Sequence, residues 1–160
     1  MPGRHNELNA CGALAVAEFV QPGALPKAEG AVRAFSGAER RLQVIFDEDV
    51  TVVDDYAHHP AEIEASIAAL RSRYAGRRLV VTFQPHLYSR TAEHLTEFGR
   101  NLSAADVLVI TDIYPAREDP MPGMSSARIA ELATCQTHYV PVRHLLPRFV
   151  AKLSRPGDVI

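Results

Sequence analysis

The sequence has little cysteine, no tryptophan and almost no excess charge. Cys11 and Cys135 are the only two cysteines among 160 residues, and neither belongs to a Cys-x-x-Cys motif or to a zinc-type Cys/His spacing. This excludes a disulfide framework and a structural zinc site, and we expect both thiols to be buried. The formal net charge of -2 gives no general attraction to polyanions, so nucleic acid and anionic membranes are poor default partners. Any phosphate site has to be local.

Long apolar runs are also missing. Glu7, Asn9 and Glu18 interrupt the apolar residues at the start of the chain, and no stretch reaches the roughly 18 apolar residues that a membrane span needs. Neither a membrane span nor a signal peptide fits this pattern, so we expect a cytoplasmic protein. Hydrophobic residues make up 47% of the chain and charged residues 22%, a balance too apolar for disorder that predicts a folded globular protein.

The first part of the chain is predicted to be helical. Leu8, Cys11, Ala15 and Phe19 recur at steps of three and four, which places them on one face of an amphipathic helix. A second helix is expected over residues 27–35. Together they predict a small helical unit before the rest of the chain.

Strands and helices alternate after this unit, and we expect a domain boundary that divides the chain into residues 1–38 and 39–160. Two β-rich runs, 42–46 and 50–53, flank an acidic turn and predict a hairpin. The strands expected after it are short, near-continuous apolar runs, which is typical of a parallel sheet covered by helices on both faces. The further elements expected are helices around 63–74, 95–102, 126–133 and 147–153, strands at 79–83, 107–110 and 139–140, and the start of another buried strand at 157–160. The predicted fold class is α/β, with a Rossmann-like, doubly wound, mostly parallel sheet.

Polar residues follow three of the predicted strands, in the segments 54–60, 82–91 and 111–119. Ligands in open α/β sheets bind outside the carboxyl ends of the strands, so these segments are the first candidates for a site. The third segment and the residues just after it contain Pro115, Pro120 and Pro122 and no periodicity, so this stretch is either a lid or simply a connection.

The first of these segments, DDYAHHP, gathers two carboxylates, a phenol and two imidazoles before a helix that Pro60 can open. One interpretation is a binding or catalytic site. The other is that Asp54 or Asp55 caps the helix while His58 and His59 face solvent.

Two other pairs have similar alternatives. His86 and Arg90 are four residues apart and could together hold a carboxylate, or Arg90 could pair with Glu93 or Glu97 on a solvated helix. Near the start of the chain, the amides of Asn6 and Asn9 share a helix face and could bind a purine edge or cap the helix.

Taken in order, five pieces of the sequence resemble the Mur ligase family, most specifically the branch that adds L-alanine to UDP-N-acetylmuramate. The matching pieces are GRHNELNA (3–10), the pair Arg40-Arg41, VVDDYAHHP (52–60), FQPHLYSRT (83–91) and TDIYPARE with its following PMPG (111–123). The resemblance covers nearly the whole chain. One departure is Leu87, where the family often has arginine, and it leaves less positive charge for the carboxylate of the amino acid.

The resemblance implies an ATP-dependent ligase of peptidoglycan synthesis. Such an enzyme phosphorylates the muramic carboxylate with ATP and Mg²⁺, after which the amine of L-alanine attacks the acyl phosphate and phosphate leaves. Two alternatives stay open: the related ligase that recycles a whole tripeptide onto UDP-N-acetylmuramate, and a non-catalytic α/β module that binds a nucleotide or a partner.

The resemblance also implies a role for eight residues. For the nucleotide, Asn6 and Asn9 would contact the adenine and Arg40 the phosphates, while Asp55 would bind the ribose or orient its neighbours. Asp55 and His58 are the expected catalytic pair. The pocket for the incoming alanine would be formed by Tyr56, His58, His86 and Arg90. No metal ligand is expected within the chain.

A phosphate-binding loop of the G-x-x-G-K-[ST] type is absent from the sequence. We therefore expect residues 1–38 to be the tail of the central, ATP-binding domain and residues 39–160 to be the carboxy-terminal, amino-acid-binding domain. We further expect this portion to have no ligase activity of its own, and to bind ATP weakly without the amino-terminal and central domains.

Overall fold

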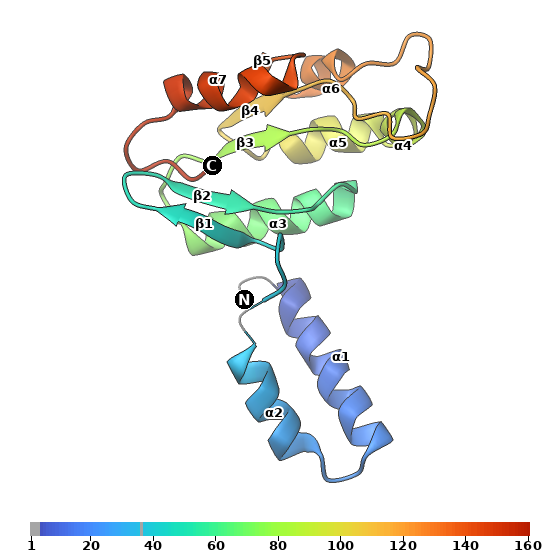
Figure 1. Ribbon diagram of the computed structural model, residues 1–160, viewed down its shortest axis with the longest axis vertical. Helices are drawn as coiled ribbons and strands as arrows, with labels where there is room; N and C mark the ends of the chain where they lie inside the picture. Colours follow the sequence, from blue (N-terminus) through green and yellow to red (C-terminus); the bar gives the residue numbers. More distant parts are fainter. Residues whose placement is uncertain (1–3, 36) are drawn as a thin grey trace.

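The computed structural model describes residues 4–35 and 37–160. Gly3, the first residue of the GRHNELNA piece, lies outside them. The described chain begins with two helices, α1 (Arg4–Val20) and α2 (Leu25–Ala34), which pack against each other and project from the rest of the molecule (Figure 1).

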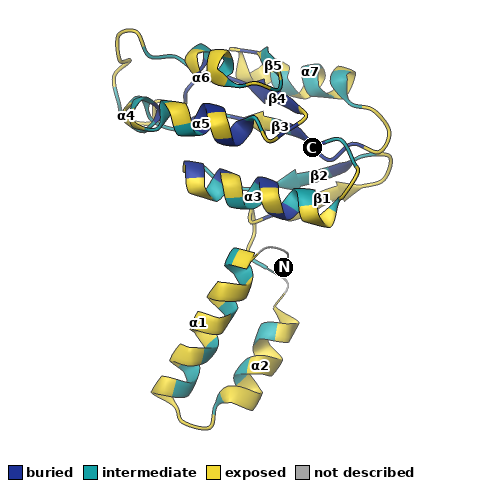
Figure 2. Cartoon of the chain, turned by 180° about the vertical axis from the view of Figure 1, so that it is seen from behind, coloured by how far each residue is buried: buried dark blue, intermediate teal, exposed yellow. Residues whose placement is uncertain are grey.

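The two helices form where the apolar spacing predicts them, but neither contains a buried residue. Phe19 is 88% exposed and Leu8 is 63% exposed, so the apolar face of α1 meets solvent (Figure 2). The expectation of two buried thiols is wrong, because Cys11 lies on this uncovered helix and is exposed, and Cys135 is only half-buried.

A β-hairpin follows the helical pair. Its strands are β1 (Gln43–Asp47) and β2 (Thr51–Asp54), which pair antiparallel with a bulge between Val44 and Phe46. The acidic turn closes with a hydrogen bond from the Glu48 N–H to the Val50 carbonyl. The predicted hairpin is confirmed to within one residue at each end.

The main sheet is parallel and has the order β3-β4-β5, with bounds Val80–Phe83, Val107–Ile110 and Gln136–Tyr139. The last residues of the chain join it to the hairpin. Val159 forms parallel bridges to Thr51, the first residue of β2, and to Leu79, just before β3, and its N–H donates to the Arg78 carbonyl. Residues 158–160 therefore act as the strand that lies between β2 and β3, as the β-branched ending predicts.

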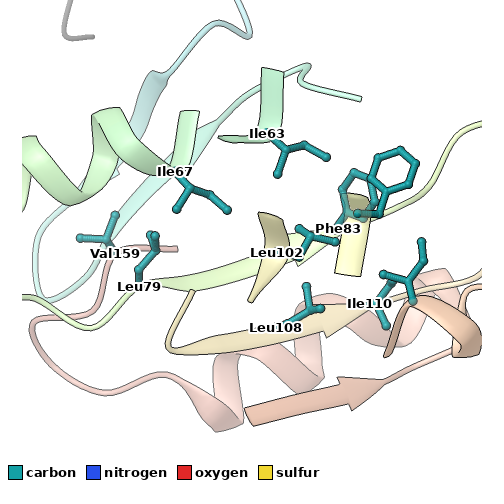
Figure 3. Packing of buried hydrophobic residues seen from close by; sticks show 10 residues of the cluster. Ile63, Ile67, Leu79, Phe83, Leu102, Leu108, Ile110 and Val159 are labelled. Atoms are coloured by element: carbon teal, nitrogen blue, oxygen red, sulfur yellow. The ribbon is translucent and has the colours of Figure 1, made fainter. Parts of the chain in front are cut away.

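Helices cover both faces of the sheet, as a doubly wound fold requires. Side chains from α3 (Pro60–Arg73), α5 (Leu95–Leu102) and α6 (Ala127–Leu132) form one buried cluster with the sheet. Figure 3 shows this cluster, to which α3 contributes Ile63 and Ile67 and the sheet contributes residues such as Leu108. On the opposite face, α7 (Leu146–Leu153), which follows a short 3-10 turn at Arg143–Leu145, packs against a second cluster.

Two expected elements differ in detail. The helix expected around 95–102 is preceded by another, α4 (Tyr88–Glu93), and His94 separates the two. The strand expected at 139–140 is instead β5, which extends over Gln136–Tyr139 at the edge of the sheet. Its polar residues hide it from a search for apolar runs, because an edge strand is only partly buried. Within the described residues, no helix is both long and apolar enough to cross a membrane.

Candidate functional site

Three polar loops converge beyond the carboxyl ends of β2, β3 and β4. His58 comes from the loop after β2, His86 from the loop after β3 and Tyr114 from the loop after β4. The ring centroids of His58 and His86 are 6.2 Å apart, and those of His86 and Tyr114 are 5.5 Å apart. Tyr56 extends the row, with its ring 5.1 Å from that of His58. We call Tyr56, His58, His86, Arg90 and Tyr114 the histidine group.

Asp55 holds the loop after β2 in shape through three hydrogen bonds. Its Oδ2 accepts from the Leu42 N–H at 3.2 Å and from the Ser66 hydroxyl at 2.9 Å, and its Oδ1 accepts from the Ala57 N–H at 2.8 Å. These contacts join the start of β1, the loop and α3. Asp55 therefore orients its neighbours, and its remaining lone pairs are available to a ligand hydroxyl.

The expectation that Asp54 or Asp55 caps α3 is wrong, because His59 is the N-cap. The His59 ring accepts a long hydrogen bond of 3.4 Å from the Ala61 N–H, and the Glu62 carboxylate accepts from the N–H groups of His58 (3.0 Å) and His59 (3.2 Å). This is a capping box, with Pro60 at the first helical position. Asp54 instead pairs with Arg40.

Glu62 stays ionised in this position. Partial burial opposes its charge, but the two backbone N–H groups, the imidazole of His58 and the guanidinium of Arg41 together lower the pKa of Glu62. Its Oε2 lies 3.5 Å from His58 Nδ1, which in turn lies 2.8 Å from the Tyr56 carbonyl. A fixed negative charge thus adjoins the imidazole of His58.

His86 and Arg90 face each other on the neighbouring loop. Arg90 Nη1 lies 3.5 Å from His86 Nδ1, at the limit of a hydrogen bond. Burial, followed by the charge of Arg90, lowers the pKa of His86, so the imidazole is neutral at pH 7 and can accept from the guanidinium. The alternative pairing of Arg90 with Glu93 or Glu97 is not what the structure shows, since Glu97 pairs with His94 at 3.0 Å.

The loops after β3 and β4 continue the parallel ladder beyond the strands. Leu87 N–H donates to the Tyr114 carbonyl at 2.9 Å, and Tyr114 N–H donates to the Pro85 carbonyl at 2.8 Å. Leu87 adopts a φ of 71°, which a branched side chain rarely tolerates and which is typical of strained functional loops. Backbone pairing therefore sets the position of His86 and of Tyr114 in the histidine group.

The segment 111–119 is more than a connection, because Tyr114 belongs to the site and Glu118 fastens the loop to α4. The Glu118 carboxylate accepts from the Ser89 N–H at 3.0 Å and also from the Ser89 hydroxyl. These hydrogen bonds lower the pKa of Glu118. Because this contact orients the first turn of α4, it also positions Arg90, the residue after Ser89.

Arg40 lies beside the histidine group. Its guanidinium carbon is 4.9 Å from the centre of the Tyr56 ring, and its Nε is 3.1 Å from Asp54 Oδ2. The Arg40 carbonyl accepts from the Tyr56 N–H, and Arg40 itself has a φ of 56°. Its predicted contact with ATP phosphates remains a prediction.

A separate cleft of about 560 Å³ lies between α1 and the sheet domain. Asn6 and Asn9 line it from α1, and Phe35 lines it from the end of α2. Asp55 and Arg41 line it from the other side. This combination provides amides, an apolar ring, a carboxylate and a cation, which suits a nucleoside with a phosphate attached. The two predicted asparagines are therefore brought together with Asp55, but not with the histidine group.

Glu62 of α3 also lines the cleft, as does Asp55 of the loop that carries Tyr56 and His58. Sequence reasoning missed Arg41, Glu62 and Tyr114. Across residues 4–35 and 37–160, no group of three or more His, Cys, Asp or Glu side chains could hold a metal ion.

The fold and these loops define the class of the protein. Residues 40–160 match the family described as Mur ligase, glutamate ligase domain, and the chain belongs to the Mur ligase family. The chain is 46% identical over 167 residues to UDP-N-acetylmuramate–L-alanine ligase of Geobacter sulfurreducens, a match that covers all of this chain and 36% of that protein. The chain thus spans about a third of the length of the curated relatives it matches.

Solved structures give the same fold. The chain superimposes on UDP-N-acetylmuramate–alanine ligase from Thermotoga maritima with a TM-score of 0.79 and 25% identity, over 99% of this chain and 34% of that one. A murein peptide ligase from Psychrobacter arcticus has a TM-score of 0.72 at 24% identity, over 100% of this chain and 34% of that one. The second likeness shows the shared fold alone.

Proposed function

We propose that this chain is the carboxy-terminal part of an ATP-dependent ligase that joins L-alanine to UDP-N-acetylmuramate in the cytoplasm. Residues 1–38 would be the tail of the ATP-binding domain and residues 39–160 the domain that binds the amino acid. The observation that carries the proposal is the convergence of His58, His86 and Arg90 from two strand ends, in a chain whose curated relatives are named for this reaction.

The chemistry needs a carboxylate to be made electrophilic. Transfer of the terminal phosphoryl group of ATP to a carboxylate oxygen releases ADP, and attack by the amine on the resulting acyl phosphate forms the amide and releases phosphate and a proton. Amide formation requires a free amine held close to the acyl carbon. Holding the two reactants in the right orientation removes a large entropic part of the barrier. The histidine group supplies donors for the carboxylate of the amino acid.

Arg90 is the proposed partner of that carboxylate. Its guanidinium offers a fork of N–H donors, and the neutral His86 beside it adds no second positive charge. His58, held by Glu62 and the Tyr56 carbonyl, is the proposed acceptor of the proton that the ammonium group of the amino acid loses to become the attacking amine. Tyr56 closes the pocket on the side of Arg40.

The residues of the cleft fit the nucleoside part of ATP. Asn6 and Asn9 provide amide donors and acceptors for a purine edge, and Asp55 retains lone pairs for a ribose hydroxyl. The phosphate-binding loop is absent from this sequence. Mg²⁺, when bound, would neutralise the charge that develops on the phosphates, and its ligands would come from the rest of the ligase.

A chimera tests the proposal. Replacing the matching third of the Geobacter sulfurreducens ligase with this chain is expected to give an enzyme that releases phosphate only when UDP-N-acetylmuramate, ATP and alanine are all present. The chain without its partner domains is expected to release none. Supplying a tripeptide in place of alanine separates the related recycling activity, and activity with the tripeptide but not with alanine would refute the proposal.

Arg90→Ala in the chimera tests the role of Arg90 in binding the carboxylate of alanine. Loss of a charge-assisted hydrogen bond of about 1.5–3 kcal/mol is expected to raise the KM for alanine by about 10- to 150-fold. The KM for ATP should change less than about threefold, because Arg90 does not line the cleft. Equal effects on the two constants would remove Arg90 from its assigned role.

A further inference from the structure

One carboxylate lies between the cleft and the histidine group. Glu62 Oε2 accepts from the His58 and His59 N–H groups at 3.0 and 3.2 Å and lies 3.5 Å from His58 Nδ1. Its other oxygen, Oε1, lies 3.6 Å from Nη1 of Arg41 on the cleft wall. The two oxygens of one side chain therefore face the two sites.

The two contacts differ in strength. Oε2 makes two hydrogen bonds to backbone that is already fixed by the start of α3. The distance from Oε1 to Arg41 exceeds that of a hydrogen bond, and the Arg41 side chain is half exposed. A multiply charged anion entering the cleft competes with a single carboxylate for such a guanidinium.

Movement of Arg41 changes the charge balance at Glu62. When the guanidinium turns toward an anion in the cleft, Oε1 loses its contact with Arg41. The contacts that remain are those of Oε2 to the His58 and His59 N–H groups and to the His58 ring. The carboxylate is then held from the His58 side alone, so it can turn about its two backbone hydrogen bonds and shift against His58 Nδ1, which lies 3.5 Å away. The consequence appears at the imidazole of His58, which does not itself line the cleft.

We propose that Glu62 is a positioning residue that couples an anionic group in the cleft to the placement of His58 in the histidine group. The anion is of the phosphate class, and its identity as part of ATP rests on the proposed function. Glu62 touches no reacting atom in this scheme. It acts through Arg41 on one side and His58 on the other.

The coupling can be tested in the isolated chain without a ligand. Arg41→Met removes the cation on the cleft side and is expected to shift the NMR signals of the His58 ring and amide. In a Glu62→Gln background the same change at Arg41 is expected to leave the His58 signals within one line width. Glutamine keeps an oxygen acceptor for the two N–H groups, so the cap of α3 is retained.

Two further variants complete this test. Glu62→Asp is too short to reach both partners and should also abolish the response. Arg71→Met, which breaks the pair with Asp106 elsewhere on α3, should leave the His58 signals unchanged in every background. The proposal is overturned if Arg41→Met does not move His58, or if the shift persists when Glu62 is replaced.

The second arm measures the coupling as binding. In the chimera, saturating ATP is expected to lower the KM for alanine at least fivefold, and Glu62→Gln should reduce that factor to less than twofold while the chimera stays folded. If Glu62 had only a structural role, its replacement would weaken the binding of both substrates. The factor by which ATP lowers the KM for alanine would then stay unchanged. An inactive chimera counts against the proposed function, whereas the signals of the isolated chain decide the role of Glu62 independently.

Discussion

Replacing Arg78 is expected to destabilise the protein more than replacing its partner, Asp158. The guanidinium donates to both oxygens of the carboxylate, at 3.0 and 2.8 Å, and the Arg155 N–H donates to Oδ2 at 2.8 Å. The Asp158 side chain is only 3% exposed, whereas that of Arg78 is 20% exposed. Loss of the cation therefore leaves an unpaired charge in the interior, and loss of the anion does not.

The magnitudes follow from this asymmetry. Breaking a buried pair by removing one partner costs about 3–5 kcal/mol, and Arg78→Met should cost about 3 kcal/mol because some solvent reaches the site. Asp158→Asn should cost about 1–2 kcal/mol, since its amide oxygen still accepts one hydrogen bond and Arg78 can be hydrated. The double variant should be more stable than the two single costs predict, because the two sites are coupled.

The difference should depend on pH. Burial opposes the charge of Asp158, but the hydrogen bond and the charge of Arg78 lower its pKa in the folded protein. The stabilisation is therefore present above the unfolded pKa of about 3.9 and is lost as the pH falls through the lower, folded pKa. The cost of Arg78→Met should accordingly be largest near pH 7 and should shrink below about pH 4.

Urea unfolding followed by circular dichroism at pH 7 and at pH 3 measures these costs, with the slope m checked for equality among variants. Arg40→Met is the control, because it breaks a pair whose side chains are 58% and 35% exposed and should cost less than about 1 kcal/mol. If Asp158→Asn is the more destabilising change, or if Arg78→Met costs no more than the control, the reasoning about a buried charge is wrong.

Three further predictions concern packing and titration. Gly99→Ala should cost about 1–2 kcal/mol in urea unfolding, since an added Cβ would lie 2.6 Å from the Leu132 Cβ and the helix gains only about 1 kcal/mol from alanine. Asn101→Ala should cost about 1–3 kcal/mol in the same assay, because it leaves the Pro60 carbonyl without its buried donor. Burial and a hydrogen bond to a carboxylate raise the pKa of Tyr139 to about 12, so stability should fall between about pH 10 and pH 12.

Each of these has a simple check. Gly12→Ala on α1, where an added Cβ meets nothing within 4 Å, is the control for Gly99 and should be neutral or stabilising. A neutral Asn101→Ala would show that water replaces the amide. For Tyr139, the tyrosinate absorbance that appears last in an alkaline titration should disappear in Tyr139→Phe, and its persistence would assign it to another tyrosine.

Much of the fold follows from local patterns. Residues 107–110 are four consecutive apolar residues, and they form β4 with all four side chains buried. The helix α3 begins where Pro60 and the capping residues place it, although the cap is His59 rather than an aspartate. Periodicity could not show that the apolar face of α1 is uncovered, because the pattern records which residues share a face and not what packs against it.

The position of the site could be predicted only as far as the ends of the strands could be predicted. His58 and His86 come together because their strands end at the same edge of the sheet, a rule that needs no distances. Arg41 and Glu62 escaped detection because their contact joins a loop to a helix 21 positions further along the chain, with no periodicity to mark it. Tyr114 was not predicted because the backbone pairing that continues past β3 and β4 is not visible in the sequence pattern of either strand.

The loops that carry His58 and His86 follow β2 and β3, which are not direct neighbours in the sheet. Thr51 and Val53 of β2 bond to residues 158 and 160, and the Val80 N–H of β3 donates to Val159 from the other side. The distance between His58 and His86 is therefore set by a strand of three residues that contributes no side chain to the site. Because Arg78 holds that strand through Asp158, the buried pair governs the geometry of the histidine group as well as the stability of the fold. In the proposed ligase, assayed as the chimera, substitutions at Arg78 should consequently raise the KM for alanine even at temperatures where the protein remains folded, since the spacing of the loops depends on this strand.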